Sequence, residues 1–86
     1  MAQYASHTSK YLNQSDEQTA VYWRTHYEIG DIVPVSGIYR CVGCGDEITS
    51  NKYDPFPPQN KHQHTDAKKE ILWELIVKTQ TTGSAR

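Results

Sequence analysis

The stretch 36–45 reads SGIYRCVGCG and decides how this chain folds. Its first half is rich in β-forming side chains, so we predict a brief strand over residues 38–40 that runs into Cys41. Its second half places Cys41 and Cys44 three positions apart, with glycines at 43 and 45 that allow a tight turn. Two thiolates on such a turn can both reach one zinc ion at about 2.3 Å. The stretch therefore predicts a hairpin whose tip, residues 41–46, binds a metal; we call this tip the cysteine loop.

Two histidines further along the chain can complete this metal site. His62 and His64 follow in a polar connection, and alternate side chains of an extended segment share one face. Two thiolates and two imidazoles make a closed tetrahedral shell, which is typical of structural zinc sites. We therefore predict that one Zn²⁺ ion is bound by Cys41, Cys44, His62 and His64. Iron can occupy the same kind of shell, because geometry and availability also decide which metal is bound.

Other interpretations of these residues stay open. The site can use only one of the two histidines, with Asp66 or His26 as the fourth ligand. A C-x-x-C motif can also be a redox pair, but such pairs belong to βαβ units with a helix, which the two glycines disfavour here. The cysteines can lack any function, and histidines in a polar loop are often only solvated. The other ligand sets are variants of the zinc site, and we rank the redox pair and the functionless cysteines below it.

Alternating side chains predict further β-segments. Residues 47–49 read as the return strand of the hairpin, and part of 20–27 reads as a strand whose odd-numbered side chains share one face. Residues 71–79 give the clearest strand, because apolar and more polar side chains alternate along them. A helix over 67–77 is the main alternative for this last segment. We expect a small mainly-β fold, an antiparallel sheet of about three strands pinned at one end by the cysteine loop.

The composition predicts a thin core. Hydrophobic residues make up 36% of the 86 positions, and the mean hydropathy is -0.77. Six Tyr and two Trp supply much of the area that can be buried. We expect Trp73 to pack under the hairpin with Ile38, Ile48 or Phe56. So small a core usually needs a disulfide, a metal or a partner chain, and we expect the metal-free chain to be largely unfolded.

The net charge and the polar ends of the chain disfavour several classes of function. The net charge of -1 disfavours a general polyanion binder and a polybasic membrane surface. Residues 1–18 are polar and show no secretion signal, and no apolar run is long enough to span a bilayer. We expect one domain over 19–79 between disordered tails at 1–18 and 80–86. We place it in the cytoplasm, where thiols stay reduced, as a monomer without membrane contact.

Four parts of the chain together resemble the rubredoxin-like zinc ribbons. They are the stretches 30–34 (GDIVP) and 36–45, the run Phe56-Pro57-Pro58 and the segment Trp73-Glu74-Leu75. More narrowly, the chain is similar to a group of small uncharacterised bacterial proteins that share the pattern SGxYxCxxCG, FPP, HxH and WxL over roughly residues 27–77. In related ribbons a cysteine follows the two prolines. Gln59 stands at that place here, and His62 with His64 are the natural replacements. The resemblance implies a zinc-ribbon fold and no known activity.

A closed metal shell predicts a binding module and not an enzyme. We expect a non-enzymatic interaction domain whose partner is a protein or a nucleic acid. A thiol-based zinc or redox sensor is the first alternative, because both ligand thiols can be oxidised. A small zinc hydrolase is the second alternative and would need Asp46 or Glu47 as the base beside an open metal position.

Overall fold

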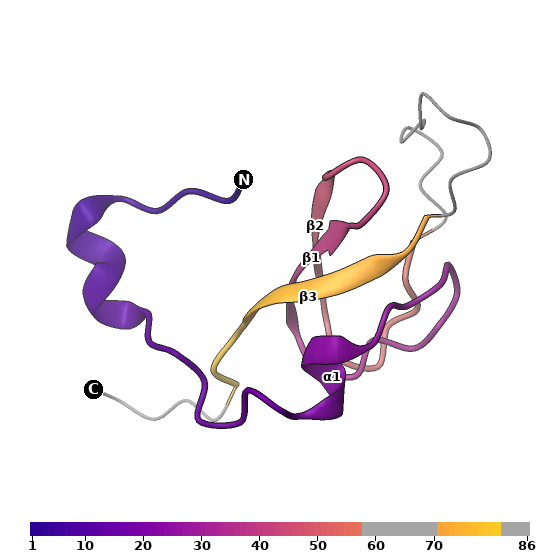
Figure 1. Ribbon diagram of the computed structural model, residues 1–86, viewed down its shortest axis with the longest axis horizontal. Helices are drawn as coiled ribbons and strands as arrows, with labels where there is room; N and C mark the ends of the chain where they lie inside the picture. The colour runs from indigo at the N-terminus through magenta and orange to yellow at the C-terminus, as the bar shows by residue number, and fades with distance from the viewer. Residues whose placement is uncertain (58–70, 82–86) are drawn as a thin grey trace.

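Strand β1 (Gly37–Cys41) lies at the centre of a three-stranded antiparallel sheet, between β2 (Glu47–Ser50) and β3 (Trp73–Lys78) (Figure 1). This computed structural model describes residues 1–57 and 71–81. The predicted class, a small mainly-β fold with about three antiparallel strands, is confirmed. The predicted segments 38–40 and 47–49 lie within β1 and β2, and β3 covers residues 73–78 of the predicted segment 71–79. The helix considered over 67–77 is therefore wrong for its described part, residues 71–77.

Register places the cysteine loop at one end of the sheet. In the β1–β2 hairpin Gly37 lies opposite Ser50, and Arg40 lies opposite Glu47. On the other side of β1, Cys41 lies opposite Trp73, with a bulge at Ile38/Tyr39 that shifts the register. The β1–β2 register therefore ends at Arg40 and the β1–β3 register at Cys41, where the chain enters the loop.

A close approach between strands explains one glycine in β1. A Cβ atom on Gly37 would collide with the backbone carbonyl oxygen of Val77 on β3 and would meet Leu75 Cδ1 at 3.1 Å. No larger residue fits between these strands without moving them apart. The bulge at Ile38/Tyr39 comes directly after this contact.

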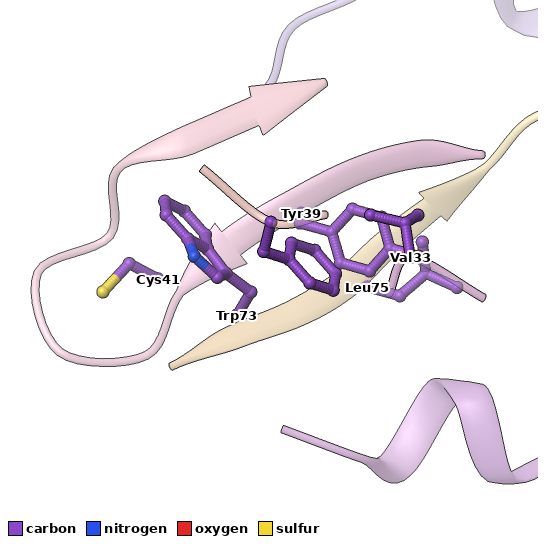
Figure 2. Packing of buried hydrophobic residues seen from close by; sticks show 6 residues of the cluster. Val33, Tyr39, Cys41, Trp73 and Leu75 are labelled. Atoms are coloured by element: carbon purple, nitrogen blue, oxygen red, sulfur yellow. The ribbon is translucent and has the colours of Figure 1, made fainter. Parts of the chain in front are cut away.

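The core lies on one face of the sheet. Alternate residues of β1 and β3 are buried, as period-two patterning requires. Figure 2 shows the row of core side chains, with Cys41 and Trp73 at one end and Val33 at the other. The buried hydrophobic residues are Val33, Tyr39, Cys41, Phe56, Trp73 and Leu75.

Trp73 occupies the core as predicted, but one of its predicted neighbours does not. The Trp73 side chain is fully buried, Phe56 belongs to the same cluster, and Ile48 packs against it half-buried. Ile38 is absent from this cluster because it precedes Tyr39 on β1, and successive side chains of a strand point to opposite faces. Of the three alternatives predicted as neighbours of Trp73, the structure thus favours Phe56 and Ile48 over Ile38.

Three aromatic rings supply much of the remaining packing. Tyr39 meets Phe56 edge-on, with ring centroids 4.9 Å apart, and Tyr27 stacks on Phe56 at 5.2 Å. The Tyr39 hydroxyl donates to the carbonyl oxygen of Val35 at 2.6 Å. Burial raises the pKa of Tyr39 to about 12 and also raises the pKa of Tyr27. Tyr39 and Tyr27 thus contribute to the core, which agrees with the thin aliphatic content of the chain.

The segment 20–27 differs from its prediction. Residues Val21–Arg24 form α1, a single helical turn, where we expected part of a strand. The amide of Trp23 donates to the carbonyl oxygen of Ala20 at 3.1 Å, and Thr25 Oγ1 donates to that of Val21 at 2.8 Å. The β-forming side chains are overridden here by tertiary contacts, because both Tyr22 and Trp23 pack against the core.

One residue of the same segment does pair as a strand. Tyr27 and Trp73 exchange two backbone hydrogen bonds of 2.9 and 2.8 Å, an isolated antiparallel bridge. Tyr27 also stacks on Phe56 and packs against the core cluster, so the bridge continues the sheet above the core.

Segments 30–33 and 53–56 run antiparallel to each other beside the sheet. The amide of Val33 donates to the backbone carbonyl oxygen of Asp54 at 2.8 Å, and the amide of Phe56 donates to that of Asp31 at 2.9 Å. A tight turn over residues 51–54 leads into the second segment. It is closed by the amide of Asp54, which donates to the backbone carbonyl oxygen of Asn51 at 3.1 Å. Tyr53 in this turn has a φ of 77° and a side chain that is 75% exposed.

The N-terminal segment carries a short 3-10 helix, Ser6–Tyr11, that we did not expect within the predicted tail. This helix contains no buried residue. In the part of the chain that the structure describes, no helix has the length and apolar character needed to cross a membrane.

Candidate metal centre

Backbone hydrogen bonds define the shape of the cysteine loop. The amide of Cys41 donates to the carbonyl oxygen of Asp46 at 2.7 Å, and the amide of Gly45 donates to that of Cys41 at 2.9 Å. Gly45 has a φ of 84°, in the region that only glycine enters at low cost. These bonds return the chain to β2 within a few residues, so the loop is tight, as the C-x-x-C-G spacing predicts.

The loop brings its two thiols together. Each cysteine carries a thiol and not a disulfide, Cys41 buried and Cys44 exposed. The two side chains are close enough for a hydrogen bond between them. Figure 2 shows the Cys41 sulfur on the loop side of the Trp73 indole, directed away from the rest of the core. One cysteine is therefore buried in the core and the other lies at the surface.

The environment holds the metal-free Cys44 thiol in its protonated form. Desolvation by the surrounding atoms is the largest cause that raises the pKa of Cys44. A hydrogen bond with the Asp46 backbone lowers the pKa, while the charges of Cys41 and Asp46 raise it further. A bound cation would reverse this balance, because zinc binds the thiolate and releases the proton.

The residue that precedes β3 is hydrogen-bonded to the cysteine loop. The amide of Val42 donates to the carbonyl oxygen of Leu72 at 2.9 Å. Leu72 precedes Trp73, which lies opposite Cys41 across the sheet. The chain that enters β3 therefore touches the loop at its first described residues.

An ion pair closes the hairpin directly behind the loop. Arg40 Nη1 lies 2.6 Å from Glu47 Oε2, and these two residues are cross-strand partners. The Arg40 guanidinium also covers Gly45, where an added Cβ atom would lie 2.6 Å from Nη2. We did not predict this pair from the sequence, although the signal was present. Arg40 and Glu47 carry opposite charges and flank the predicted tip, where a hairpin register places them face to face.

The other predicted ligands lie outside the described residues, namely His62, His64 and the alternative ligand Asp66. Across residues 1–57 and 71–81, no group of three or more histidine, cysteine or acidic side chains comes close enough together to hold an ion. His26 therefore does not join Cys41 and Cys44, and its use as the fourth ligand is not supported. His7 is exposed on the 3-10 helix Ser6–Tyr11.

The residues that the structure describes fit one half of a zinc or iron shell. Two adjacent thiols on a tight loop, one of them at the surface, are the donor set that borderline-soft cations prefer. The fit concerns the two sulfur atoms, and the predicted nitrogen ligands lie outside the described residues.

Comparison with known proteins gives one extensive similarity. No protein-family model matches the chain, and no solved structure matches it. The chain is 55% identical over 83 residues to the Escherichia coli protein named Protein L, an alignment that covers 96% of this chain and 93% of that protein. Identity at this level over nearly the whole length of both chains shows common ancestry and a common fold. The chain therefore belongs to the family of Protein L of Escherichia coli.

Proposed function

We propose that this protein is a small zinc-stabilised interaction domain, in which Cys41, Cys44, His62 and His64 hold one Zn²⁺ ion and no reaction is catalysed. The observation that carries the proposal is the convergence of the two thiols on a loop braced by the hairpin and by Leu72. A metal bound there would tie β1 and β2 to the segment that enters β3. The partner of such a module is a protein or a nucleic acid.

Chain connectivity supports the histidines as the remaining ligands. Leu72 is hydrogen-bonded to Val42 in the cysteine loop, and His64 precedes Leu72 by only eight positions. An extended chain spans about 3.3–3.6 Å per residue, so this length is sufficient to return an imidazole to the two sulfurs. Zn²⁺ also completes a neutral shell with two thiolates and two neutral imidazoles.

The size of the core favours a structural role for the metal. Six buried hydrophobic residues make up the described core, and one of them is Cys41 itself. Structural zinc contributes an apparent folding free energy of about 10–16 kcal/mol in finger peptides. That contribution exceeds the few kcal/mol that a small core leaves over after conformational entropy. We therefore expect the chain to lose most of its tertiary structure when zinc is removed.

The surroundings of the loop weigh against a hydrolase. Glu47, one of the two candidate bases, is held by Arg40 at 2.6 Å with its side chain 18% exposed. A carboxylate paired in this way supports the hairpin and is poorly suited to take a proton from a metal-bound water. The enzyme hypothesis therefore ranks last.

A thiol-based zinc or redox sensor is the second candidate, because Cys44 is exposed while its neighbour Cys41 is buried. Mild peroxide separates the two proposals. A sensor releases zinc and recovers it after reduction, whereas a purely structural site keeps its zinc. Both proposals place the protein in the cytoplasm, where adjacent thiols remain reduced.

Elemental analysis of purified variants tests the ligand set. We expect one zinc per chain in the natural protein and a large loss in each single variant Cys41→Ser, Cys44→Ser, His62→Ala and His64→Ala. His7→Ala and His26→Ala are matched controls, since both histidines are exposed, and should keep the full zinc content. Full zinc content in both His62→Ala and His64→Ala would contradict the proposed shell.

A further inference from the structure

A groove lies along the C-terminal half of β3, where the N-terminal segment passes the end of this strand (Figure 1). We call it the β3 groove. Its volume is about 690 Å³, within the range of about 300–1,000 Å³ that ligand sites usually have. One wall comes from the segment 11–16 and the other from the segment 76–81, and Trp23 of α1 lines the groove as well. The cysteine loop lies at the other end of β3, beside Trp73.

The indole N–H of Trp23 is a hydrogen-bond donor that lacks an acceptor. Its Nε1 atom is buried, and in residues 1–57 and 71–81 it donates to no other group. An unpaired buried donor costs stability, so such a group indicates a place where a ligand atom fits. The Trp23 side chain is half-buried and lines the β3 groove. An occupant with a carbonyl oxygen near this ring would supply the missing acceptor.

Strand β3 also directs backbone groups away from the rest of the sheet at this place. The amide of Thr79 donates to the carbonyl oxygen of Ser36 at 3.0 Å, so the Thr79 N–H faces the β1 side. Successive residues direct their backbone groups to opposite sides of a strand, so those of Lys78 face the outer edge. Tyr27 already pairs with this edge at Trp73 through two backbone hydrogen bonds. Over the described ranges no segment pairs in the same way with Lys78, which lines the groove.

The charges beside the groove favour a peptide over a nucleic acid. Asp16 and Lys78 are the charged residues that line it, so the groove has no positive excess for phosphate groups. The Lys78 ammonium lies over the Tyr22 ring, 5.4 Å from its centroid. The Asp16 side chain is exposed and forms no ion pair within the part of the chain that the structure describes. A cationic side chain of an occupant would therefore complement Asp16.

We propose that the β3 groove binds an extended peptide segment of another protein. One residue of the peptide exchanges both backbone hydrogen bonds with Lys78, which continues the edge pairing that Tyr27 begins. A peptide carbonyl oxygen accepts the N–H of Trp23, and a lysine or arginine of the peptide lies against Asp16. An apolar side chain of the peptide packs on Ile76. The role rests on the proposed interaction function, although no residue of the groove is a proposed metal ligand.

An NMR titration of the full chain, purified with zinc, tests the groove with the capped peptide Val-Lys-Val-Lys-Val. We expect the peptide to shift the Trp23 indole N–H signal and the Lys78 amide signal, with a dissociation constant at or below about 1 mM. The Trp73 indole signal should stay in place, since this ring lies at the other end of β3. Absence of both shifts at about 5 mM peptide would overturn the proposal.

Two matched peptides and one oligonucleotide test the chemistry of the occupant. The peptide Val-Glu-Val-Glu-Val should bind at least about fivefold more weakly, because its charges repel Asp16. The lysine peptide with a fully N-methylated backbone should not bind, because it cannot donate to the Lys78 carbonyl oxygen. Equal binding of the N-methylated peptide would overturn the backbone pairing. The same two shifts on addition of a single-stranded DNA oligonucleotide would overturn the choice of a peptide.

Substitutions in the groove locate the binding site. Trp23→Phe removes the indole N–H and Asp16→Asn removes the charge, and each should weaken binding of the lysine peptide about three- to fivefold. Glu28→Gln, at an exposed position outside the groove, is the control and should bind as the natural protein does. Unchanged binding in both groove variants would overturn the site.

Zinc analysis of the same samples keeps the groove and the metal site apart. A natural protein that holds its full zinc content and binds no peptide overturns the β3 groove alone. A natural protein that binds the peptide without holding zinc contradicts the proposed metal site and leaves the groove supported.

Discussion

Arg40 and Glu47 form an ion pair of 2.6 Å across the hairpin, at the last register position before the cysteine loop. The pair fixes the two strands that enter and leave the loop. The Arg40 side chain also lies over Gly45, whose positive φ closes the turn. The pair therefore stabilises the hairpin that carries the two thiols and contributes no ligand to the metal.

Removing the charge of Glu47 tests how much the ion pair with Arg40 stabilises the fold. Glu47→Gln should lower the free energy of unfolding by about 0.5–1 kcal/mol, because the pair is partly exposed. Zinc content should be unchanged, since Glu47 is not a ligand. Urea unfolding and elemental analysis measure the two effects, with Glu28→Gln on the surface as the control. Loss of zinc on this substitution would show that the carboxylate acts in the metal site itself.

Gly37 tests the close contact between β1 and β3. Gly37→Ala should lower the free energy of unfolding by about 2–4 kcal/mol, because the new Cβ atom collides with the Val77 carbonyl. Gly30→Ala is the control: its φ is 87°, but the space around it is open, so strain alone should cost about 1–2 kcal/mol. Equal effects of the two substitutions in denaturant unfolding would contradict the packing account of Gly37.

Tyr53 occupies a backbone conformation that suits glycine. Its φ of 77° strains an ordinary side chain, while the exposed ring gains only a contact with the Lys52 ammonium at 5.0 Å. Tyr53→Gly should therefore raise the free energy of unfolding by about 0.5–1 kcal/mol. Tyr53→Ala keeps the strain and loses the ring, and it should lower stability slightly. The account of this turn would be wrong if the glycine variant were the less stable of the two.

The raised pKa of Tyr39 predicts how the free energy of unfolding changes at alkaline pH. Burial raises the pKa of Tyr39 to about 12 in the folded state, against an ordinary value of 10.0. As pH rises, the unfolded chain therefore loses the Tyr39 hydroxyl proton before the folded chain does. The contribution of this proton to the free energy of unfolding is complete below pH 10 and is lost as pH rises towards 12. The loss amounts to about 2–3 kcal/mol for this group.

The measurement for Tyr39 is urea unfolding at several pH values between 9 and 12, compared with Tyr39→Phe. The phenylalanine variant loses the hydrogen bond to Val35 and should be less stable by about 1 kcal/mol at neutral pH. Its stability should fall less steeply above pH 10. Identical slopes for the two proteins would mean that Tyr39 is not the titrating group.

The strands could be predicted because their sequences carry a strong period-two signal. Trp73 and Leu75 are buried at the alternate positions that the pattern of 71–79 indicates, and the hairpin follows from the β-forming residues on each side of the C-x-x-C-G turn. The helix α1 could not be predicted, because one turn is too short to show a 3.6-residue period. Its conformation is set by where Tyr22 and Trp23 meet the core, which the local sequence does not encode.

The sequence predicted the part of the candidate site that lies on the tight turn, namely Cys41 and Cys44. Glycine after Cys44 indicated a tight loop, and the structure brings the two thiols together there. The support of the loop from Leu72 was not predictable, because it joins residues 30 positions apart through backbone atoms that any sequence possesses. The contribution of His62 and His64 stays a prediction.

X-ray absorption at the zinc edge tests the central claim most directly, using the full chain purified with zinc. The proposed site predicts two sulfur ligands at about 2.3 Å and two nitrogen ligands at about 2.0–2.1 Å, with no oxygen in the shell. A zinc shell without sulfur, or one in which a water oxygen occupies a position, would contradict a closed structural site built on Cys41 and Cys44.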